Sequence, residues 1–201
     1  MKKKKLIPIA LAVCALMLTG CQGAEEGKGT QPEAGAVSGE TSQPGGKTAF
    51  TQFTATTLDG KETDQSIFSE YKLTMVNIWG TFCSPCIKEM PYLGELSREY
   101  AEKGVQILGI VSDAGDMKGN IDEAAVEKAK KIVEQTGADY PHLLPSMDLI
   151  RNKLSAVSSI PETVFVDAQG RQLGKAYIGA LTKKEWAAII DSLLEKVNGD
   201  A

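Results

Sequence analysis

The chain reads LTMVNIWGTFCSPC at residues 73–86, and this stretch says more about the fold than any other part of the 201 residues. Its first seven residues are nearly all apolar, which is typical of a strand buried on both faces of a mixed or parallel sheet. A helix is predicted from about Ser84 to Lys103, because apolar residues then recur at helical spacing, with Pro91 expected to kink it. The two cysteines therefore lie where a central strand becomes a helix.

Further strands and helices are predicted on both sides of this stretch. Residues 105–111 are a second apolar run and predict a second buried strand. Asp59-Gly60 favours a tight turn, and so predicts a short hairpin made by 53–58 and the residues from Lys61 onward. The other predicted elements are a helix from near Asn120 to Gly137 with Asn120 and Glu123 as a capping pair, a shorter helix over 147–157, strands 163–166 and 172–178 joined by a turn over 167–170, and a last helix opened by a Thr182-x-x-Glu185 capping box. This order predicts an α/β three-layer sandwich around a mixed central sheet, with the hairpin as an N-terminal extension.

The amino-terminal residues have the pattern of a secretory address. Lys2–Lys5 form a basic region, and the apolar run Leu6–Leu18 is shorter than the roughly 18 residues that span a bilayer. Leu18-Thr19-Gly20-Cys21 resembles the lipobox of bacterial lipoproteins, which implies a signal peptide over 1–20, lost together with Cys14, and a lipid anchor on Cys21. An ordinary cleaved signal or an uncleaved anchor is the alternative, and every one of these interpretations places the rest of the chain outside the cytoplasm.

A flexible tether is predicted to follow Cys21 as far as residue 47. Residues 22–47 contain seven glycines and two prolines but no aromatic residue, and Val37 is their only sizeable apolar side chain. Such a segment cannot bury enough surface to offset its chain entropy. The remaining residues, 48–201, are numerous enough for one well-buried domain.

Charge and composition exclude two classes of partner. The formal charge is −4, and without Lys2–Lys5 it becomes −8, because 18 basic and 26 acidic side chains remain. So acidic a chain has no bulk electrostatic reason to bind nucleic acid. A structural zinc site needs about four ligands drawn mainly from cysteine and histidine, and the chain has four cysteines and His142 alone. Neither nucleic acid nor a metal is expected.

The cysteines of the CSPC motif are the candidate reactive groups. The amino terminus of a helix offers unpaired amides and positive potential, which stabilise a thiolate. Cys83 is therefore the candidate attacking sulfur, and Cys86, one turn further on, is expected to lie inside and to resolve a mixed disulfide. A structural disulfide would close too short a loop to remove much unfolded-state entropy. A metal site would have to recruit His142 and an acid, and His142 is assigned no role beyond a loop or strand edge.

Two longer segments resemble a known family. Residues 76–91, VNIWGTFCSPCIKEMP, and residues 158–167, SSIPETVFVD, are similar to the two signatures of the TlpA/ResA group of thioredoxin-like thiol-disulfide oxidoreductases, within the redoxin superfamily. The resemblance extends from about Phe50 to Val197. It implies a thioredoxin-like sandwich whose redox-active disulfide is Cys83–Cys86, with Ser84 and Pro85 completing the motif.

The resemblance also implies that Ile160-Pro161 is a cis peptide beside the cysteines. A cis X-Pro bond presents the backbone of the preceding residue for strand-like pairing with a substrate, and proline has no amide to donate to the sulfur. The alternative is an ordinary turn proline that ends the loop after the short helix. Ile160 and Pro161 are therefore candidate substrate-binding residues.

Glu89 and Trp79 are two further candidates near the cysteines. Thioredoxin has a buried aspartate six residues before its first cysteine, whereas this chain has Asn77, which cannot titrate. Glu89 matches a glutamate of ResA-like proteins, and is the candidate acid and base for Cys86 or a modulator of the thiol pKa. Alternatively, Glu89 is a solvated helix residue. Trp79 is a supporting residue, for which core packing is the simpler role.

The resemblance implies a lipid-anchored reductase outside the cytoplasm, monomeric and without a cofactor other than its disulfide. Its expected substrates are oxidised proteins, such as the haem-binding cysteines of apocytochromes c or an extracytoplasmic methionine sulfoxide reductase. Its expected electron donor is a membrane thiol protein of the CcdA/DsbD type. Ile160 before the proline is the thioredoxin-like choice, which favours reduction.

Three other functions compete with this reductase. A peroxiredoxin would need a proline at Val76 and a threonine at Gly80 to complete Pro-x-x-x-Thr-x-x-Cys, so its motif fails at two positions. An exported dithiol oxidase would use the same cysteines with electrons flowing the other way. A redox-inert binding lipoprotein on the same scaffold is the third alternative, and the paired cysteines argue against it.

Overall fold

The computed structural model describes residues 48–199. The predicted signal peptide over 1–20, Cys14, the predicted lipid anchor on Cys21 and the predicted tether over 21–47 lie outside the described residues. Within 48–199, no helix combines the length and the apolar character that crossing a membrane requires.

A five-stranded mixed sheet forms the centre of the domain, in the order β5-β4-β3-β6-β7. β3 pairs in parallel with β4, and β4 with β5, whereas β6 and β7 are antiparallel to their neighbours. The strands are β3 (Leu73–Trp79), β4 (Val105–Val111), β5 (His142–Leu143), β6 (Glu162–Val166) and β7 (Gln172–Ile178). The predicted strand over 73–79 is thus the central one.

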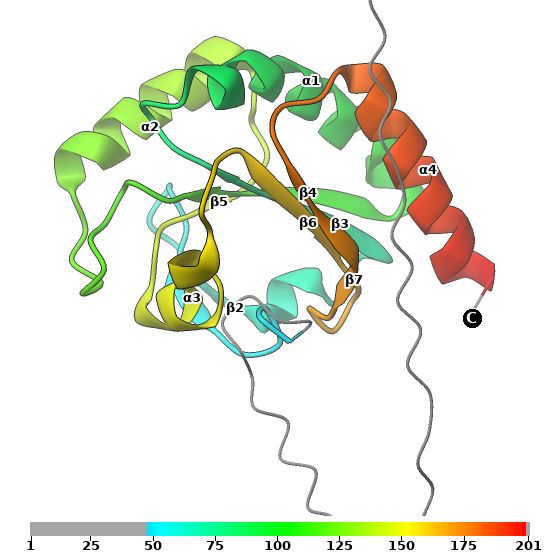
Figure 1. The fold of residues 1–201 in the computed structure, drawn as a ribbon, viewed down its shortest axis with the longest axis horizontal. Helices are drawn as coiled ribbons and strands as arrows, with labels where there is room; N and C mark the ends of the chain where they lie inside the picture. The colour runs from blue at the N-terminus through cyan, green and yellow to red at the C-terminus, as the bar shows by residue number, and fades with distance from the viewer. Residues whose placement is uncertain (1–47, 200–201) are drawn as a thin grey trace, which may run out of the picture. The chain divides into compact units, whose positions relative to one another are not determined.

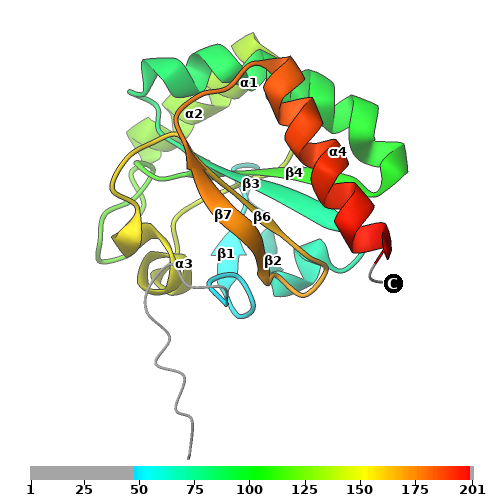
Figure 2. The same cartoon turned by 45° about the vertical axis from the view of Figure 1, so that its right-hand side comes forward.

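Helices cover both faces of this sheet (Figures 1 and 2). Three helices lie on one face: α1 (Ser84–Tyr100), α2 (Glu123–Thr136) and α4 (Lys183–Gly199). The other face carries α3 (Met147–Asn152), the 3-10 helix η1 (Gln65–Phe68) and a hairpin of β1 (Thr54–Thr56) and β2 (Glu62–Asp64). The α/β/α sandwich with an N-terminal hairpin is therefore confirmed.

Residues of β3 contribute to a separate core on each face of the sheet, because successive side chains of a strand point in opposite directions. Leu73, Met75 and Trp79 pack with α1, α2 and α4. Val76 and Ile78 pack in the second core, with the segment before β1, with η1 and with α3. Every residue of β3 is buried, which explains why the strand is nearly all apolar.

Several predicted boundaries are wrong. The cap of α2 is Asp122, whose carboxylate accepts hydrogen bonds from the amides of Ala124 and Ala125, so the predicted Asn120–Glu123 pair does not cap this helix. Asn120 instead bonds to Asp116 within the preceding loop. Two 3-10 turns replace predicted helix ends: η2 (Ala101–Lys103) follows α1, and η3 (Leu154–Ala156) follows α3.

The helix predicted over 147–157 breaks at Lys153. The backbone of Lys153 leaves the helical region, and its ammonium pairs with the buried carboxylate of Glu162 at the start of β6. Both side chains are almost fully buried. This ion pair joins α3 to β6, and helix propensity cannot predict it from the residues of the helix alone. The helix α3 therefore ends at Asn152, one residue before Lys153.

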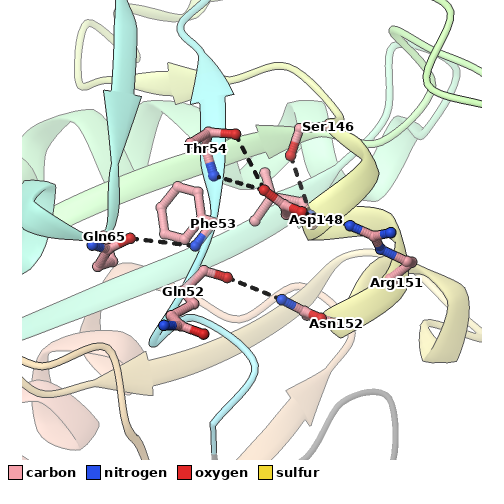
Figure 3. Close-up of polar contacts among 9 residues, drawn as sticks. Gln52, Phe53, Thr54, Gln65, Ser146, Asp148, Arg151 and Asn152 are labelled. Atoms are coloured by element: carbon pink, nitrogen blue, oxygen red, sulfur yellow. Dashed lines mark hydrogen bonds and ion pairs between the residues drawn. The ribbon is translucent and has the colours of Figure 1, made fainter.

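Side chains of α3 connect this helix to the N-terminal hairpin (Figure 3). The amide and the hydroxyl of Thr54 both donate to one oxygen of Asp148, each at 3.1 Å. Asn152 donates to the carbonyl of Gln52 at 3.0 Å, and Arg151 pairs with the second oxygen of Asp148. The hairpin and the residues before it are therefore hydrogen-bonded to α3, the helix that precedes the Ile160-Pro161 loop.

Candidate active site

Cys83 and Cys86 form a disulfide at the start of α1. Cys83 is the N-cap residue of the helix, and its sulfur accepts a hydrogen bond from the amide of Cys86 at 3.3 Å. Cys83 is 6% exposed, whereas Cys86 is completely buried. Only Cys83 is therefore open to a partner, and its sulfur faces the positive end of the helix, which stabilises a thiolate.

The Ile160-Pro161 peptide bond is cis and lies beside the cysteines. The Ile160 carbonyl oxygen is 3.7 Å from the sulfur of Cys83. The cis geometry implied by the resemblance is thus present, and the alternative of an ordinary turn proline is wrong. A substrate that reaches Cys83 must also meet the exposed backbone next to Ile160.

The loop between β3 and α1 holds Cys83 close to Ile160. A Cβ atom on Gly80 would lie 3.0 Å from the Ile160 side chain and 3.1 Å from the Phe82 ring, so a larger residue would push these groups apart. The carboxylate of Asp113 accepts hydrogen bonds from the amide and the hydroxyl of Thr81, at 2.9 and 2.6 Å. Sequence reasoning missed Asp113, because nothing local links it to the motif.

Glu89 is buried, with only 1% of its surface exposed, so the interpretation of a solvated helix residue is wrong. One carboxylate oxygen accepts from the Asn77 side chain at 3.1 Å. The other accepts from the Leu181 amide and the Trp186 indole, each at 3.2 Å. Glu89 lies three residues after Cys86, a spacing that places two side chains on one face of a helix.

The surroundings of Glu89 set its proton affinity. Burial raises the pKa of the Glu89 carboxyl above its usual value, while the hydrogen bonds from Trp186, Leu181 and Asn77 lower it in part. A carboxyl with a raised pKa binds a proton more tightly than an ordinary carboxyl does, which suits proton exchange with a nearby thiol.

Asn77 extends the buried polar group across the sheet. Its amide nitrogen also donates to the hydroxyl of Thr163 on β6, at 3.0 Å. Its carbonyl oxygen and the hydroxyl of Tyr140 are the buried side-chain atoms of residues 48–199 that lack a partner. Burial, together with the nearby charge of Glu89, raises the pKa of the Tyr140 phenol.

Trp79 packs in the same core as Cys83 and Cys86 and is hydrogen-bonded to His142. The Trp79 indole donates to Nδ1 of His142 at 3.1 Å, and Nε2 of His142 then donates to the Ala138 carbonyl at 2.9 Å. Burial lowers the pKa of His142 to about 4, so the ring is neutral at pH 7. His142 occupies the edge strand β5, directly over Gly109, where a Cβ would lie 2.0 Å from Nδ1.

An apolar groove of about 240 Å³ runs next to Cys83. Phe82 and Met117 on its walls are 70% and 63% exposed, which is unusual for large apolar side chains. The groove is lined by Phe82, Met117, Pro145, Leu154, Val157 and Ile160, among others. Phe82 belongs to the segment 76–91, whereas the fold brings the other residues named here from loops far from it in the sequence. A larger hollow of about 980 Å³, between the hairpin and α2, contains none of the site residues.

Ligands for a metal do not gather anywhere in the part of the chain that the structure describes. No group of three or more His, Cys, Asp or Glu side chains within 48–199 could hold an ion.

Solved structures with the same architecture show which fold class the domain belongs to. A thioredoxin-family thiol:disulfide interchange protein of Chlorobium tepidum aligns with a TM-score of 0.59 and 24% identity, over 76% of this chain and 97% of that one. A secreted Mycobacterium tuberculosis disulfide oxidoreductase, described as homologous to E. coli DsbE, aligns with a TM-score of 0.54 and 23% identity, over 71% and 96%. The shared fold is that of thioredoxin.

Sequence relatives place the chain within that class. The Redoxin family model matches residues 44–188. The thiol-disulfide oxidoreductase ResA of Bacillus cereus is 33% identical over 145 residues, which cover 72% of this chain and 74% of the relative. The chain belongs to the Redoxin family and is a thioredoxin-like thiol-disulfide oxidoreductase of the ResA/TlpA group.

Proposed function

We propose that this protein is a lipid-anchored, extracytoplasmic reductase of disulfides in exported proteins. The observation that carries the proposal is the pairing of one accessible sulfur with one buried sulfur. Cys83 lies at the helix terminus beside the Ile160 carbonyl, whereas Cys86 is buried, one helical turn before the buried Glu89 on the same face of α1. The signal-like residues 1–21 of the sequence support the location outside the cytoplasm.

The reaction proceeds in two exchange steps. The Cys83 thiolate attacks one sulfur of the substrate disulfide, whose S–S bond breaks as a mixed disulfide forms and the first substrate thiolate leaves. The Cys86 thiol then gives its proton to Glu89 and attacks the Cys83 sulfur. The mixed disulfide breaks, the second substrate sulfur leaves as a thiolate, and the proton passes from Glu89 to this leaving thiolate. The substrate gains two electrons, and the Cys83–Cys86 pair is left oxidised.

The groove beside Cys83 suits a protein substrate. Its exposed apolar walls can take side chains that flank a cysteine, while the Ile160 backbone can pair with an extended segment. The substrates proposed from the family resemblance are the haem-binding cysteines of an apocytochrome c or a methionine sulfoxide reductase. A membrane thiol donor of the CcdA/DsbD type would return the pair to the dithiol.

The direction of electron flow is tested by the reduction potential of the pair. Equilibration of the full chain with glutathione buffers should give a value near that of thioredoxin, roughly −270 mV. A value near −120 mV, which is typical of a strong oxidant, would overturn the reductase in favour of an exported dithiol oxidase.

Substrates are identified by trapping. Cys86→Ser leaves Cys83 able to attack but removes the resolving thiol, so mixed disulfides with substrates should accumulate in cells. The double variant with Cys83→Ser and Cys86→Ser is the matched control and should trap nothing. If the single variant captures no exported cysteine protein, the proposed substrate class is wrong.

A further inference from the structure

Trp186 is placed at the first turn of α4 by the sequence that precedes it. The hydroxyl of Thr182 accepts from the Glu185 amide, and the Glu185 carboxylate accepts from the Thr182 amide at 2.8 Å, which is the reciprocal pattern of a capping box. The amide of Trp186 donates to the Thr182 carbonyl at 3.0 Å. The start of α4 is therefore fixed, and the Trp186 side chain enters the core rather than the solvent.

The indole of Trp186 has one orientation imposed by its neighbours. Its ring is completely buried and packs against Tyr177 and Phe165, with ring centres 5.8 and 6.3 Å away. Its N–H donates to Glu89, 97 residues away in the sequence. An indole N–H without a partner at this depth would be costly, as would a carboxylate that lost a donor.

The groups around Glu89 show why the Trp186 hydrogen bond is important for keeping the Glu89 carboxylate ionised. Asn77 comes from β3 and Leu181 from the loop before α4, and neither side chain titrates. Cys86 is the titratable group on the same face of α1. Tyr140 lies in the segment before β5, and the charge of Glu89 raises the pKa of its phenol. It is the titratable residue within 48–199 that faces Glu89 from another element. No cation is among these neighbours, so hydrogen bonds alone stabilise the carboxylate.

We infer that Trp186 is a positioning residue for thiol-disulfide exchange: its indole N–H holds the Glu89 carboxylate beside Cys86 and keeps it able to accept the thiol proton. The inference rests on the proposed role of Glu89. It makes the C-terminal helix part of the redox centre, although α4 contributes no atom to the exchange itself.

The test follows the two exchange steps separately. The reduced full chain reacts with excess dithiobis(nitrobenzoate), and each step releases one coloured nitrothiobenzoate. The first release reports the attack by Cys83 on the reagent. The second reports the attack by Cys86 on the resulting mixed disulfide, after its proton has moved to Glu89. Both rates are measured across a series of pH values for each variant.

Trp186→Phe removes the N–H donor and keeps an aromatic ring in the core. Loss of a hydrogen bond to a charged group favours its protonated form, so the midpoint of the second release should move by about one pH unit toward higher pH, a tenfold change in proton affinity. The first release should keep its wild-type profile. The shift should be absent when Trp186→Phe is made together with Glu89→Gln.

Ile190→Val is the matched control for loosened packing. Ile190 is buried on the same helix but makes no polar contact with Glu89, so this variant should unfold at a slightly lower temperature and keep the wild-type midpoint. Thermal unfolding of each variant shows that the folded protein was measured.

The outcomes distinguish the inferred role of Trp186 from the proposed role of Glu89. An unmoved midpoint in Trp186→Phe, together with a changed profile in Glu89→Gln, overturns the role of Trp186 and leaves that of Glu89 in place. An equal shift in Ile190→Val also overturns it, because packing alone would then explain the effect. If Glu89→Gln keeps the wild-type profile, the role of Glu89 fails and the inference fails with it.

Discussion

The buried carboxylate of Glu89 connects the stability of the fold to pH. Burial raises its pKa above the ordinary 4.5, a value that the unfolded chain regains on exposure to water. The folded state therefore binds this proton more tightly than the unfolded state does. A group of this kind favours folding at low pH, and its contribution is lost as the pH rises from about 4.5 through the raised folded value.

Glu89→Gln should remove this dependence. With the disulfide intact in both proteins, we expect the free energy of unfolding of the wild type to fall relative to that of the variant as the pH increases through this window. Urea unfolding at a series of pH values measures the difference, and the other titrating groups cancel because both proteins share them. Parallel curves would contradict the raised pKa.

Lys153 and Glu162 form the second buried charge arrangement, next to the Ile160-Pro161 loop. Lys153→Met should leave the Glu162 carboxylate buried without a partner, which costs about 3–5 kcal/mol of stability. Replacing both residues, Lys153→Met with Glu162→Gln, should restore much of the loss because no uncompensated charge remains.

The matched control for Lys153 is Lys61, which pairs with Asp59 at the surface. Both side chains are exposed, so water and salt screen their attraction, and Lys61→Met should leave the urea midpoint unchanged. A loss of stability in Lys153→Met no larger than that of the Lys61 variant would show that the Lys153–Glu162 pair is not a buried one.

The sequence was sufficient to predict which residues react but not what surrounds them. Cys83 and Cys86 are identified by four consecutive residues at a strand-to-helix junction, so local pattern was enough. The partners of Glu89 come from β3, α4 and the loop between β7 and α4, up to 97 residues away. No periodicity or spacing reports that a tryptophan on the last helix will reach a glutamate on the first.

At the scale of elements, prediction succeeded where a single local pattern dominates. The β3 and β4 strands are long apolar runs, and the α4 capping box is four residues long, so all three were predicted correctly. The two-residue β5 is too short to produce a pattern, and it exists because Gly109 leaves room for the His142 ring. Likewise, Asn120 and Asp122 are both plausible caps until the loop geometry selects Asp122.

The attachment of the N-terminal hairpin to α3 yields a prediction at this scale (Figure 3). The Thr54 amide is held by Asp148 of α3. Asp148→Ala should therefore speed hydrogen exchange at the Thr54 amide and across β1 and β2, while amides of β3 keep their protection because the central sheet is untouched.

Arg151→Ala is the control for this attachment. Arg151 contacts only the other oxygen of Asp148, through an exposed ion pair, so its loss should leave the Thr54 amide protected. Unchanged exchange at Thr54 in Asp148→Ala would show that the hairpin is held by its apolar contacts with the second core alone.

At the scale of the whole molecule, the fold brings the site together at one end of the sheet. Cys83 follows the carboxyl end of β3, Asp113 follows that of β4, and both lie at the edge where ligands gather in open α/β sheets. The antiparallel β6 begins at the same edge and carries Pro161 to it. The Cys83 sulfur and the groove next to it therefore lie at this edge of the sheet.

The charge of the whole molecule bears on the proposed attachment to a membrane. Without Lys2–Lys5 the formal charge is −8, because 18 basic and 26 acidic side chains remain, so attraction to anionic lipid cannot hold the domain there. The helices of residues 48–199 include none that could span a bilayer. The lipid proposed on Cys21, with two acyl chains, would supply stable anchoring, which one chain does not.

Cys21→Ser should therefore move the protein from the detergent phase to the aqueous phase in a phase-partition experiment on whole cells. The wild-type mature protein should begin at residue 21 and carry the mass of a diacylglycerol, which mass spectrometry of its first peptide detects. Thiol reactivity of Cys83 should be equal in both proteins, because the anchor lies at least 60 residues from the site in sequence. A serine variant that still partitions into detergent would instead indicate the apolar run Leu6–Leu18 as an uncleaved anchor.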